Sequence, residues 1–371
     1  MLVILVLMAA ASFAGAIALP LLYPLPSAAH IHLALAAGIM PLIFGAMTHF
    51  VPVLTRSAAA PKGVRLIPLL ASSAGTLAFF SFAASNRIYY FAAFFALALA
   101  MAFAMWIMRR ANKAVGKPHP CLNWYLGAIA CLILAFVAVL AMTLWPEQRI
   151  ALKRLHLHLN TLGFIGLTAI ATLQVLLPTA VGRPDPQAAA RLRQDMKWAL
   201  GGALLISIGA AWFKPLAWTG AVLWAIPLVH LCKAWFTLYF REIRQLHGAA
   251  SSLAAALTGF FAAIFFGALH TGGILNTANT AHAFIFAFLF PLVTGAVSQL
   301  LPIWARPGPQ TPWHTLARQH LGKGGGYRAL LFLAGGLLLG LGWREGMLLS
   351  IAALAAFLLQ LATTARPAPV T

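Results

Sequence analysis

The sequence predicts an all-α polytopic membrane protein with twelve transmembrane helices, arranged as three pseudo-threefold repeats of four helices. Three observations predict this fold class: a low content of charged residues, a succession of long apolar segments, and a histidine–proline spacing that occurs three times. The chain of 371 residues is 62% hydrophobic and 8% charged, whereas about a quarter of a soluble domain is charged. Because five acidic residues cannot furnish a soluble surface, we expect a lipid bilayer around the chain.

Charged residues, prolines and glycines divide the chain into twelve candidate spans. The spans comprise residues 1–23, 29–54, 66–85, 88–108, 121–144, 153–178, 198–213, 215–238, 249–270, 278–304, 328–343 and 345–364. The first lacks a basic stretch before its apolar run, so we interpret it as a span rather than a secretory signal. The prediction is therefore one integral membrane domain over residues 1–371.

Basic residues are distributed unevenly between the two sides of these spans. If the N-terminus is cytoplasmic, nineteen of the 25 basic residues fall in cytoplasmic segments, Arg366 among them. The exterior segments keep six: Arg87, Arg149, Lys153, Arg154, Lys214 and Arg344. This distribution follows the positive-inside rule and predicts that both termini are cytoplasmic. The net charge of +20 then reflects topology and attraction to anionic lipid rather than a nucleic-acid partner.

An internal repeat relates the second, sixth and tenth spans. In each, a histidine is followed twenty residues later by a proline and soon afterwards by an arginine: His32, Pro52 and Arg56; His158, Pro178 and Arg183; His282, Pro302 and Arg306. Successive copies lie 126 and 124 residues apart and each period contains four spans, which gives repeat units of approximately 1–115, 116–240 and 241–371. Twenty helical residues rise ~30 Å, the thickness of the hydrocarbon layer, so each copy is expected to run from one membrane face to the other.

Six histidines gather at the predicted exterior ends of these spans. They are His30, His32, His156, His158, His270 and His282. Residues i and i+2 diverge by ~200° on a helix, so a His-x-His pair presents one imidazole to each of two neighbouring spaces. Neutral imidazole binds haem iron, copper or zinc without adding buried charge. A single histidine at a helix end often only forms local hydrogen bonds, but six at one depth favour ligation.

The other histidines and the cysteines are less informative. His49 stands where the other copies place Gln174 and Gln299, which indicates a polar cap with a second role left open. His230 is interpreted either as a ligand or as a buried, hydrogen-bonded residue. The three cysteines form no C-x-x-C pair, so covalent haem attachment and a cysteine zinc site are not expected.

The arrangement resembles known haem proteins. Twelve spans in three repeats, with histidines on the second and tenth, resemble subunit I of the haem–copper oxidases. The second-span sequence "HIHLALAAGIMPLIFGAMTHFVPVLTR" is more similar to the NnrS family. That family has a His-x-His motif at the start of this span and a proline about 22 residues after the first histidine. His30 and Pro52 have this spacing here. The sixth-span text "HLNTLGFIGLTAI" also resembles that family's histidine and glycine pattern.

The resemblance implies a haem- and copper-containing protein of the bacterial inner membrane associated with nitric oxide metabolism. It implies one or two haem b groups bound by His30, His32, His270 and His282, with His32 and His282 sharing one haem. It also implies copper or a second haem iron at His156 or His158. Quinol or another respiratory electron donor, and nitric oxide or another small gas, are the expected partners. The catalytic residues, and whether the protein is an enzyme, stay open.

The sequence departs from both families at several positions. Leu33 stands where the NnrS family usually has glutamate, and Asn160 stands where the oxidases have a tyrosine four residues after a ligand histidine. The seventh span lacks the two adjacent histidines of the oxidases, and all five acidic residues fall at span ends or in loops. Proton pumping and nitric oxide reduction of the oxidase type are therefore not expected.

Two other classes of function remain open. A secondary transporter often has twelve spans, but its repeats would relate two halves rather than three thirds of the chain. A non-catalytic haem-delivery or assembly partner of a respiratory complex would share the histidines. A Soret band distinguishes a haem protein from a transporter, and turnover with quinol or nitric oxide distinguishes an enzyme from a delivery partner.

Overall fold

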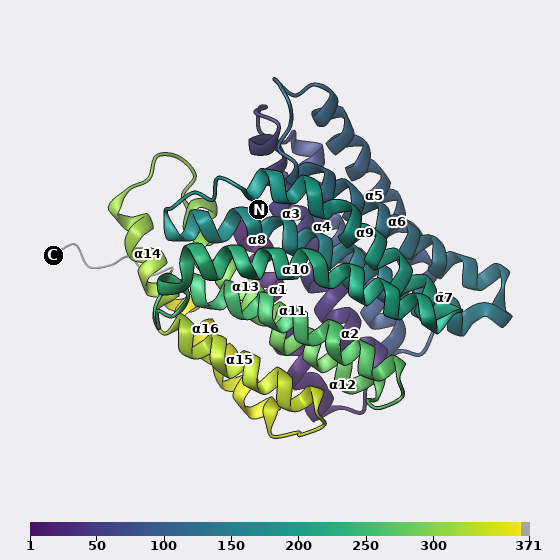
Figure 1. Cartoon of the computed structure of the whole chain (residues 1–371). Helices are drawn as coiled ribbons and strands as arrows, with labels where there is room; N and C mark the ends of the chain where they lie inside the picture. The colour runs from purple at the N-terminus through teal and green to yellow at the C-terminus, as the bar shows by residue number, and fades with distance from the viewer. Residues whose placement is uncertain (365–371) are drawn as a thin grey trace. The chain divides into compact units, whose positions relative to one another are not determined.

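A computed structural model of the protein describes residues 1–364, so Arg366 lies outside the described residues (Figure 1). All regular structure within residues 1–364 is helical. The helices are α1 (Leu2–Leu22), α2 (Ser27–His32), η1 (Leu33–Ile39), α3 (Met40–Leu54), α4 (Lys62–Ala83), α5 (Tyr89–Asn112), α6 (Cys121–Leu144), η2 (Pro146–Gln148), α7 (Arg149–His158), η3 (Leu159–Gly166), α8 (Leu167–Val181), α9 (Ala188–Ala211), α10 (Lys214–Ile243), α11 (Ala250–Thr271), α12 (Thr277–His282), η4 (Ala283–Leu289), α13 (Phe290–Ala305), α14 (Pro312–Gly322), α15 (Gly325–Gly340) and α16 (Gly346–Thr364).

Ten helical segments within residues 1–364 are long and apolar enough to cross a membrane. The chain is therefore a multi-pass membrane protein. The predicted spans 198–213 and 328–343 form α9 and α15, which are not among the ten. Helix α9 carries Arg191, Arg193, Asp195 and Lys197 in its first half, and the 16 residues of α15 rise only ~24 Å, less than the ~30 Å of the hydrocarbon layer. The total of twelve spans thus stays a prediction.

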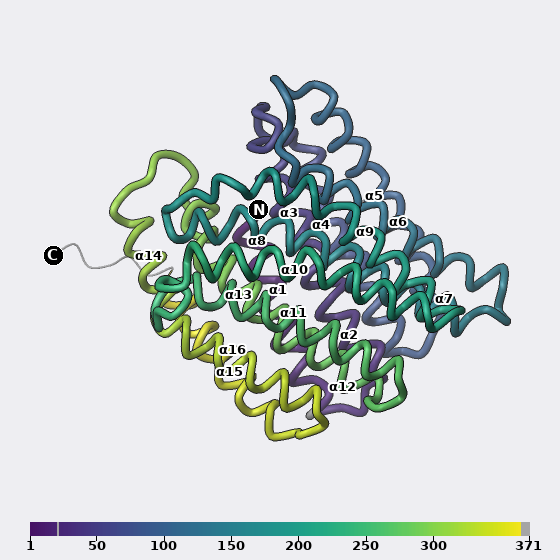
Figure 2. Tube along the Cα trace, in the orientation of Figure 1, coloured from purple at the N-terminus to yellow at the C-terminus, as the bar shows by residue number. Residues whose placement is uncertain are grey.

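The chain divides into two compact units. Unit 1 comprises Met1–Ala171 and Leu192–Leu216, and unit 2 comprises Thr172–Arg191 and the chain from Ala217 onward. In unit 1, α1 and α4 pack against η1, α5 packs against α6, and α6 packs against η3. In unit 2, α11 and α15 pack against η4, and α15 and α16 lie side by side at the yellow end of the chain (Figure 2).

A short π-helix follows each histidine of the repeat. Segments η1, η3 and η4 begin at Leu33, Leu159 and Ala283, directly after His32, His158 and His282. A π-helix is rare, usually occurs as a single turn within an α-helix, and is frequent at functional sites. The hydrophobic pattern of the sequence did not indicate these segments. They set the rotation of the helix just beyond the histidines.

Two of the π-helices pack against neighbouring helices at glycines. A Cβ atom at Gly75 of α4 would overlap the backbone of Ala36 in η1, and one at Gly336 of α15 would overlap the backbone of Ala287 in η4. Only glycine allows so close an approach between backbones. These contacts therefore fix the register of a neighbouring helix on each π-helix.

The start of α9 differs from the sequence prediction. We expected the span to begin at residue 198, but the helix begins at Ala188 and includes Asp195, which is fully buried. Asp195 therefore lies within a helix rather than in a loop. The charged residues in the first turns of α9 interrupt the apolar pattern, so the sequence predicts a start only after Lys197.

Candidate functional site

The structure brings together two of the predicted site histidines, His32 and His156, in unit 1. Their ring centroids lie 6.4 Å apart and their ring planes differ by only 8°. His32 ends α2 and His156 lies in the last turn of α7. Each therefore stands just before a π-helix, although 124 residues separate them in sequence.

Both rings are held by backbone carbonyl groups. His32 Nδ1 lies 2.7 Å from the carbonyl oxygen of Ala28, and His156 Nδ1 lies 3.0 Å from that of Ala135 on α6. Because a carbonyl oxygen can only accept, we assign the proton of each ring to Nδ1, which leaves Nε2 unprotonated. A neutral imidazole with one nitrogen bonded to a backbone carbonyl is a form that metal-binding histidines commonly have.

The surroundings of the pair are aromatic. The Phe82 ring lies 4.5 Å from the ring of His32, and the Phe136 ring lies 6.5 Å from that of His156. Phe82 stacks on Tyr89 at 4.8 Å, and the Tyr89 hydroxyl accepts a hydrogen bond of 3.0 Å from Arg149. The pair thus has apolar walls and a basic residue nearby, a setting that favours neutral imidazoles.

Asn160, on the π-helix η3, contacts His156. Its Nδ2 atom donates to the His156 carbonyl at 3.0 Å and lies 3.3 Å from Nδ1 and 3.5 Å from Nε2 of that ring. The amide therefore sits over the edge of the imidazole and restricts its rotation. Within residues 1–364 no group of three or more His, Cys, Asp or Glu residues could hold a metal ion.

The other predicted site residues have different environments. His158 donates from Nδ1 to the carbonyl of Arg154 at 2.8 Å, and the buried Nδ1 of His30 has no hydrogen-bond partner in the described residues. In unit 2, His270 donates to the Leu275 carbonyl at 2.8 Å, and the ring of His282 lies 6.1 Å from that of Phe286. His32 and His282 belong to different units, so their shared haem stays a prediction.

Histidines in the loops have local roles. The His314 ring completes a capping box with Thr311 at the start of α14. His119, between α5 and α6, accepts a hydrogen bond from the backbone N–H of Cys121 at 3.3 Å. Burial, and then the charge of Arg193, lower the pKa of His119, which suits this acceptor role.

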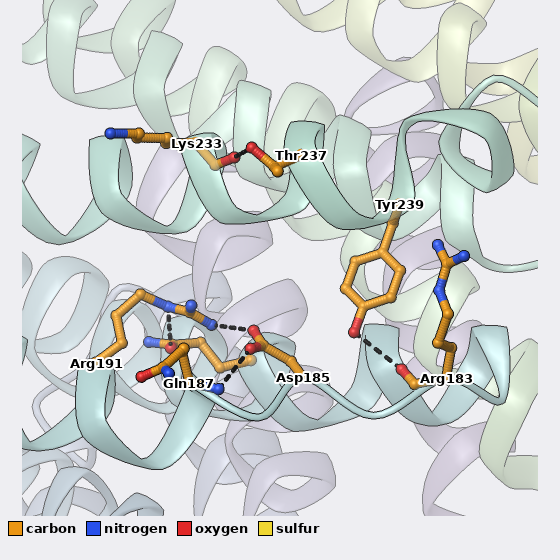
Figure 3. Close-up of polar contacts among 8 residues, drawn as sticks. Arg183, Asp185, Gln187, Arg191, Lys233, Thr237 and Tyr239 are labelled. Atoms are coloured by element: carbon orange, nitrogen blue, oxygen red, sulfur yellow. Dashed lines mark hydrogen bonds and ion pairs between the residues drawn. The ribbon is translucent and has the colours of Figure 1, made fainter.

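Sequence reasoning missed a buried polar network in unit 2 (Figure 3). Arg191 donates to the Asp185 carboxylate at 2.6 Å and to the Gln174 amide oxygen at 2.8 Å, and the Gln187 backbone N–H donates to Asp185 at 2.9 Å. Nearby, the Tyr239 hydroxyl donates to the Arg183 carbonyl at 2.9 Å. Only the matching positions of Gln174 and His49 in the repeat pointed to this network. Arg191 and Asp185 neutralise each other, so we assign the network to structure rather than chemistry, although the buried Nε2 atom of Gln174 has no hydrogen-bond partner within residues 1–364.

A comparison of the sequence with models of protein families and with curated proteins finds no match. The functional interpretation therefore depends on the histidine geometry and on the resemblance in the repeated spans.

Proposed function

We propose that the protein is a haem-binding redox protein of the bacterial inner membrane, and that His32 and His156 are the two ligands of one haem iron. One observation carries this proposal: two parallel imidazoles, 6.4 Å apart, that both direct their Nδ1 protons to backbone carbonyls. The Nδ1 contact alone also occurs at His158 and His270, so the proposal depends on the close and nearly parallel placement of the two rings.

The separation of the rings suits a shared metal. An imidazole nitrogen binds a metal at ~2.0–2.1 Å, so two rings whose centroids lie 6.4 Å apart are close enough that both could hold one ion. The flanking Phe82 and Phe136 are typical of a haem environment, because a porphyrin buries a large apolar surface. Bound there, haem supplies one-electron transfer. The chain's part is to hold both rings, keep them neutral and exclude water from Nε2.

This pairing changes one ligand assignment from the sequence, because His156 replaces His282 as the proposed partner of His32. His158 faces elsewhere, as expected from the ~200° between residues i and i+2. His30 in unit 1, and separately His270 and His282 in unit 2, keep the haem-ligand assignments that we made from the sequence. The buried, unsatisfied Nδ1 of His30 is consistent with such a partner.

The wider setting of the proposal combines the repeat and the resemblance. The three repeats are supported by the π-helices that follow His32, His158 and His282. Twelve spans and cytoplasmic termini belong to the proposal on the pattern of apolar segments and basic residues. The resemblance to the NnrS family supports a role in nitric oxide metabolism or respiratory electron transfer, with quinol as a candidate donor. Copper remains part of the proposal on the same ground.

Haem and metal analysis of the purified protein tests the proposal. We expect a Soret band and at least one haem b per chain. His32→Ala and His156→Ala should each lower the haem content and alter the reduced spectrum, because each removes one residue that would hold the haem. His158→Ala is the matched control: it lies on the same helix, is likewise bonded to a backbone carbonyl, and should leave this haem unchanged.

Two results would contradict the proposal. A colourless protein from cells supplied with haem would favour the transporter. Full haem content and an unaltered spectrum in both His32→Ala and His156→Ala would remove the ligand assignment even if haem is present. Turnover assays with quinol and nitric oxide then separate an enzyme from a haem-delivery partner.

A further inference from the structure

The end of helix α3 contains an arginine in a backbone conformation that favours glycine. Arg56 has φ of +49°. Its backbone N–H donates to the Val53 carbonyl at 3.2 Å, and the next N–H, of Ser57, donates to the Pro52 carbonyl at 2.9 Å. This pair of bonds is the Schellman motif, in which the left-handed residue is usually glycine because a Cβ is unfavourable there.

The second copy of the repeat has a glycine at the corresponding left-handed position. After Pro178, Gly182 has φ of +73°, its N–H donates to Thr179, and the N–H of Arg183 donates to Pro178. Gly182 and Arg56 stand at the same distance from their prolines. The first copy therefore retains an arginine where the same turn forms more easily with glycine. A residue kept against its local preference is a sign of function.

The side chain of Arg56 lies at a cleft. A cleft of about 390 Å³ at this end of α3 is lined by Thr48, His49, Pro52, Val53, Arg56 and Ser57, together with Ala59. One wall is apolar and open, because Val53 is 64% exposed. The cleft thus places a guanidinium, an imidazole and hydroxyl groups beside an exposed hydrocarbon surface.

The charged side chains that lie at the cleft, Arg56 and Arg110, are basic. The first 146 residues contain no acidic side chain, and Arg56 has no ion pair within residues 1–364. Arg110 reaches this region by donating to the Ala59 carbonyl at 3.2 Å. Because Arg56 pairs with no carboxylate of the described residues, the cleft favours an anionic ligand.

We propose that this cleft binds the phosphate head group of an anionic phospholipid. The Arg56 guanidinium donates to the phosphate oxygens in the two-pronged geometry that arginine offers. His49 and Ser57 lie beside it, and the start of the acyl chain covers Val53. Free phosphate shares the chemistry of the head group but cannot use the apolar wall. The site is independent of the histidine pair His32–His156.

Thermal unfolding of the full-length protein in neutral detergent tests the proposal. Phosphatidylglycerol added to the micelles should raise Tm, whereas phosphatidylcholine and millimolar inorganic phosphate should not. In Arg56→Gly the apparent affinity for phosphatidylglycerol should fall roughly tenfold, because a charge-assisted hydrogen-bonding partner is lost. The same variant without lipid should unfold at a higher temperature than the wild type, because glycine relieves the left-handed strain.

Ser85→Gly is the matched control. Ser85, with φ of +54°, has the same role at the end of α4, so this change should also raise Tm but should leave phosphatidylglycerol binding unchanged. Arg56→Asn supplies a second test, because asparagine tolerates the left-handed conformation without the charge. Wild-type affinity for phosphatidylglycerol in both Arg56 variants would overturn the proposal. An equal, Arg56-dependent shift with inorganic phosphate would overturn the lipid as its ligand.

Discussion

Single polar residues in the protein interior fall into two groups. Arg191 and Asp185 form an ion pair of 2.6 Å with side chains only 9% and 0% exposed, and Gln174 completes the bonding of the guanidinium. His32 and His156 instead donate from Nδ1 to backbone carbonyls. In the first set the two charges neutralise each other, whereas the second set consists of imidazoles that face one another. On this difference we propose a structural role for the first set and ligand binding for the second.

We predict that Arg191→Met destabilises the protein by ~3–5 kcal/mol, because removing one partner of a buried ion pair leaves the carboxylate of Asp185 uncompensated. Arg193→Met is the control: Arg193 lies two residues further on α9 and is exposed, so its replacement should change stability by less than about 0.5 kcal/mol. Thermal unfolding of both variants in one detergent measures the difference. Equal stability of the two variants would show that the Arg191–Asp185 pair contributes nothing.

At the level of elements, the π-helices couple the histidines to the helix packing. Each begins directly after a repeat histidine, and η1 and η4 contact a glycine of a neighbouring helix. The extra residue per turn rotates everything that follows relative to the histidine. The packing of α4 on η1 and of α15 on η4, through Gly75 and Gly336, therefore influences the direction of the imidazole before each π-helix.

Gly75→Ala should destabilise unit 1 by about 1–3 kcal/mol, because the added methyl overlaps the backbone of Ala36 and the two helices must separate. It should also lower haem retention, since η1 positions His32. Gly63→Ala, on the same helix α4, meets no atom within 4 Å and should be neutral or stabilise by up to about 1 kcal/mol. Thermal unfolding and haem content of the two variants check this. Gly75→Ala behaving like Gly63→Ala would mean that the close approach is not required.

At the scale of the whole molecule, we predict the orientation of the chain in the membrane from the distribution of its basic residues. Nineteen of the 25 basic residues fall on one predicted side of the membrane, and each lysine or arginine near an anionic surface contributes about 1 kcal/mol. Summed over many loops, this bias is large compared with the packing preferences of any one helix. Orientation is therefore a property of the complete chain rather than of one span.

Reporter fusions test this topology. Fusions after Arg56, Lys117 and Arg318 should report the cytoplasm, and one after Gly273 should report the exterior, because basic loops are retained on the cytoplasmic side. An exterior signal at two of the first three positions would overturn the orientation. It would also contradict the prediction that the six histidines lie at the same depth in the membrane.

Much of the histidine site could be anticipated from the sequence, but its pairing could not. The His-x-His spacing indicated that His156 and His158 face different spaces, in agreement with their hydrogen-bond partners on α6 and on α7 itself. Which distant histidine meets His156 depends on how α2, α6 and α7 pack. No local pattern contains that information, because 124 residues separate His32 from His156.

By itself, the sequence determined the all-helical membrane class and most helix positions, because burial of apolar segments in lipid leaves helices as the available solution for a chain of this composition. It also singled out the histidines as candidate ligands, since polar residues in apolar segments are costly and therefore few. Only the tertiary structure decided the π-helices, the helical start of α9 before Asp195, and the partnership of His32 with His156. These features depend on backbone approach and side-chain contacts between distant segments, which hydrophobic periodicity does not encode.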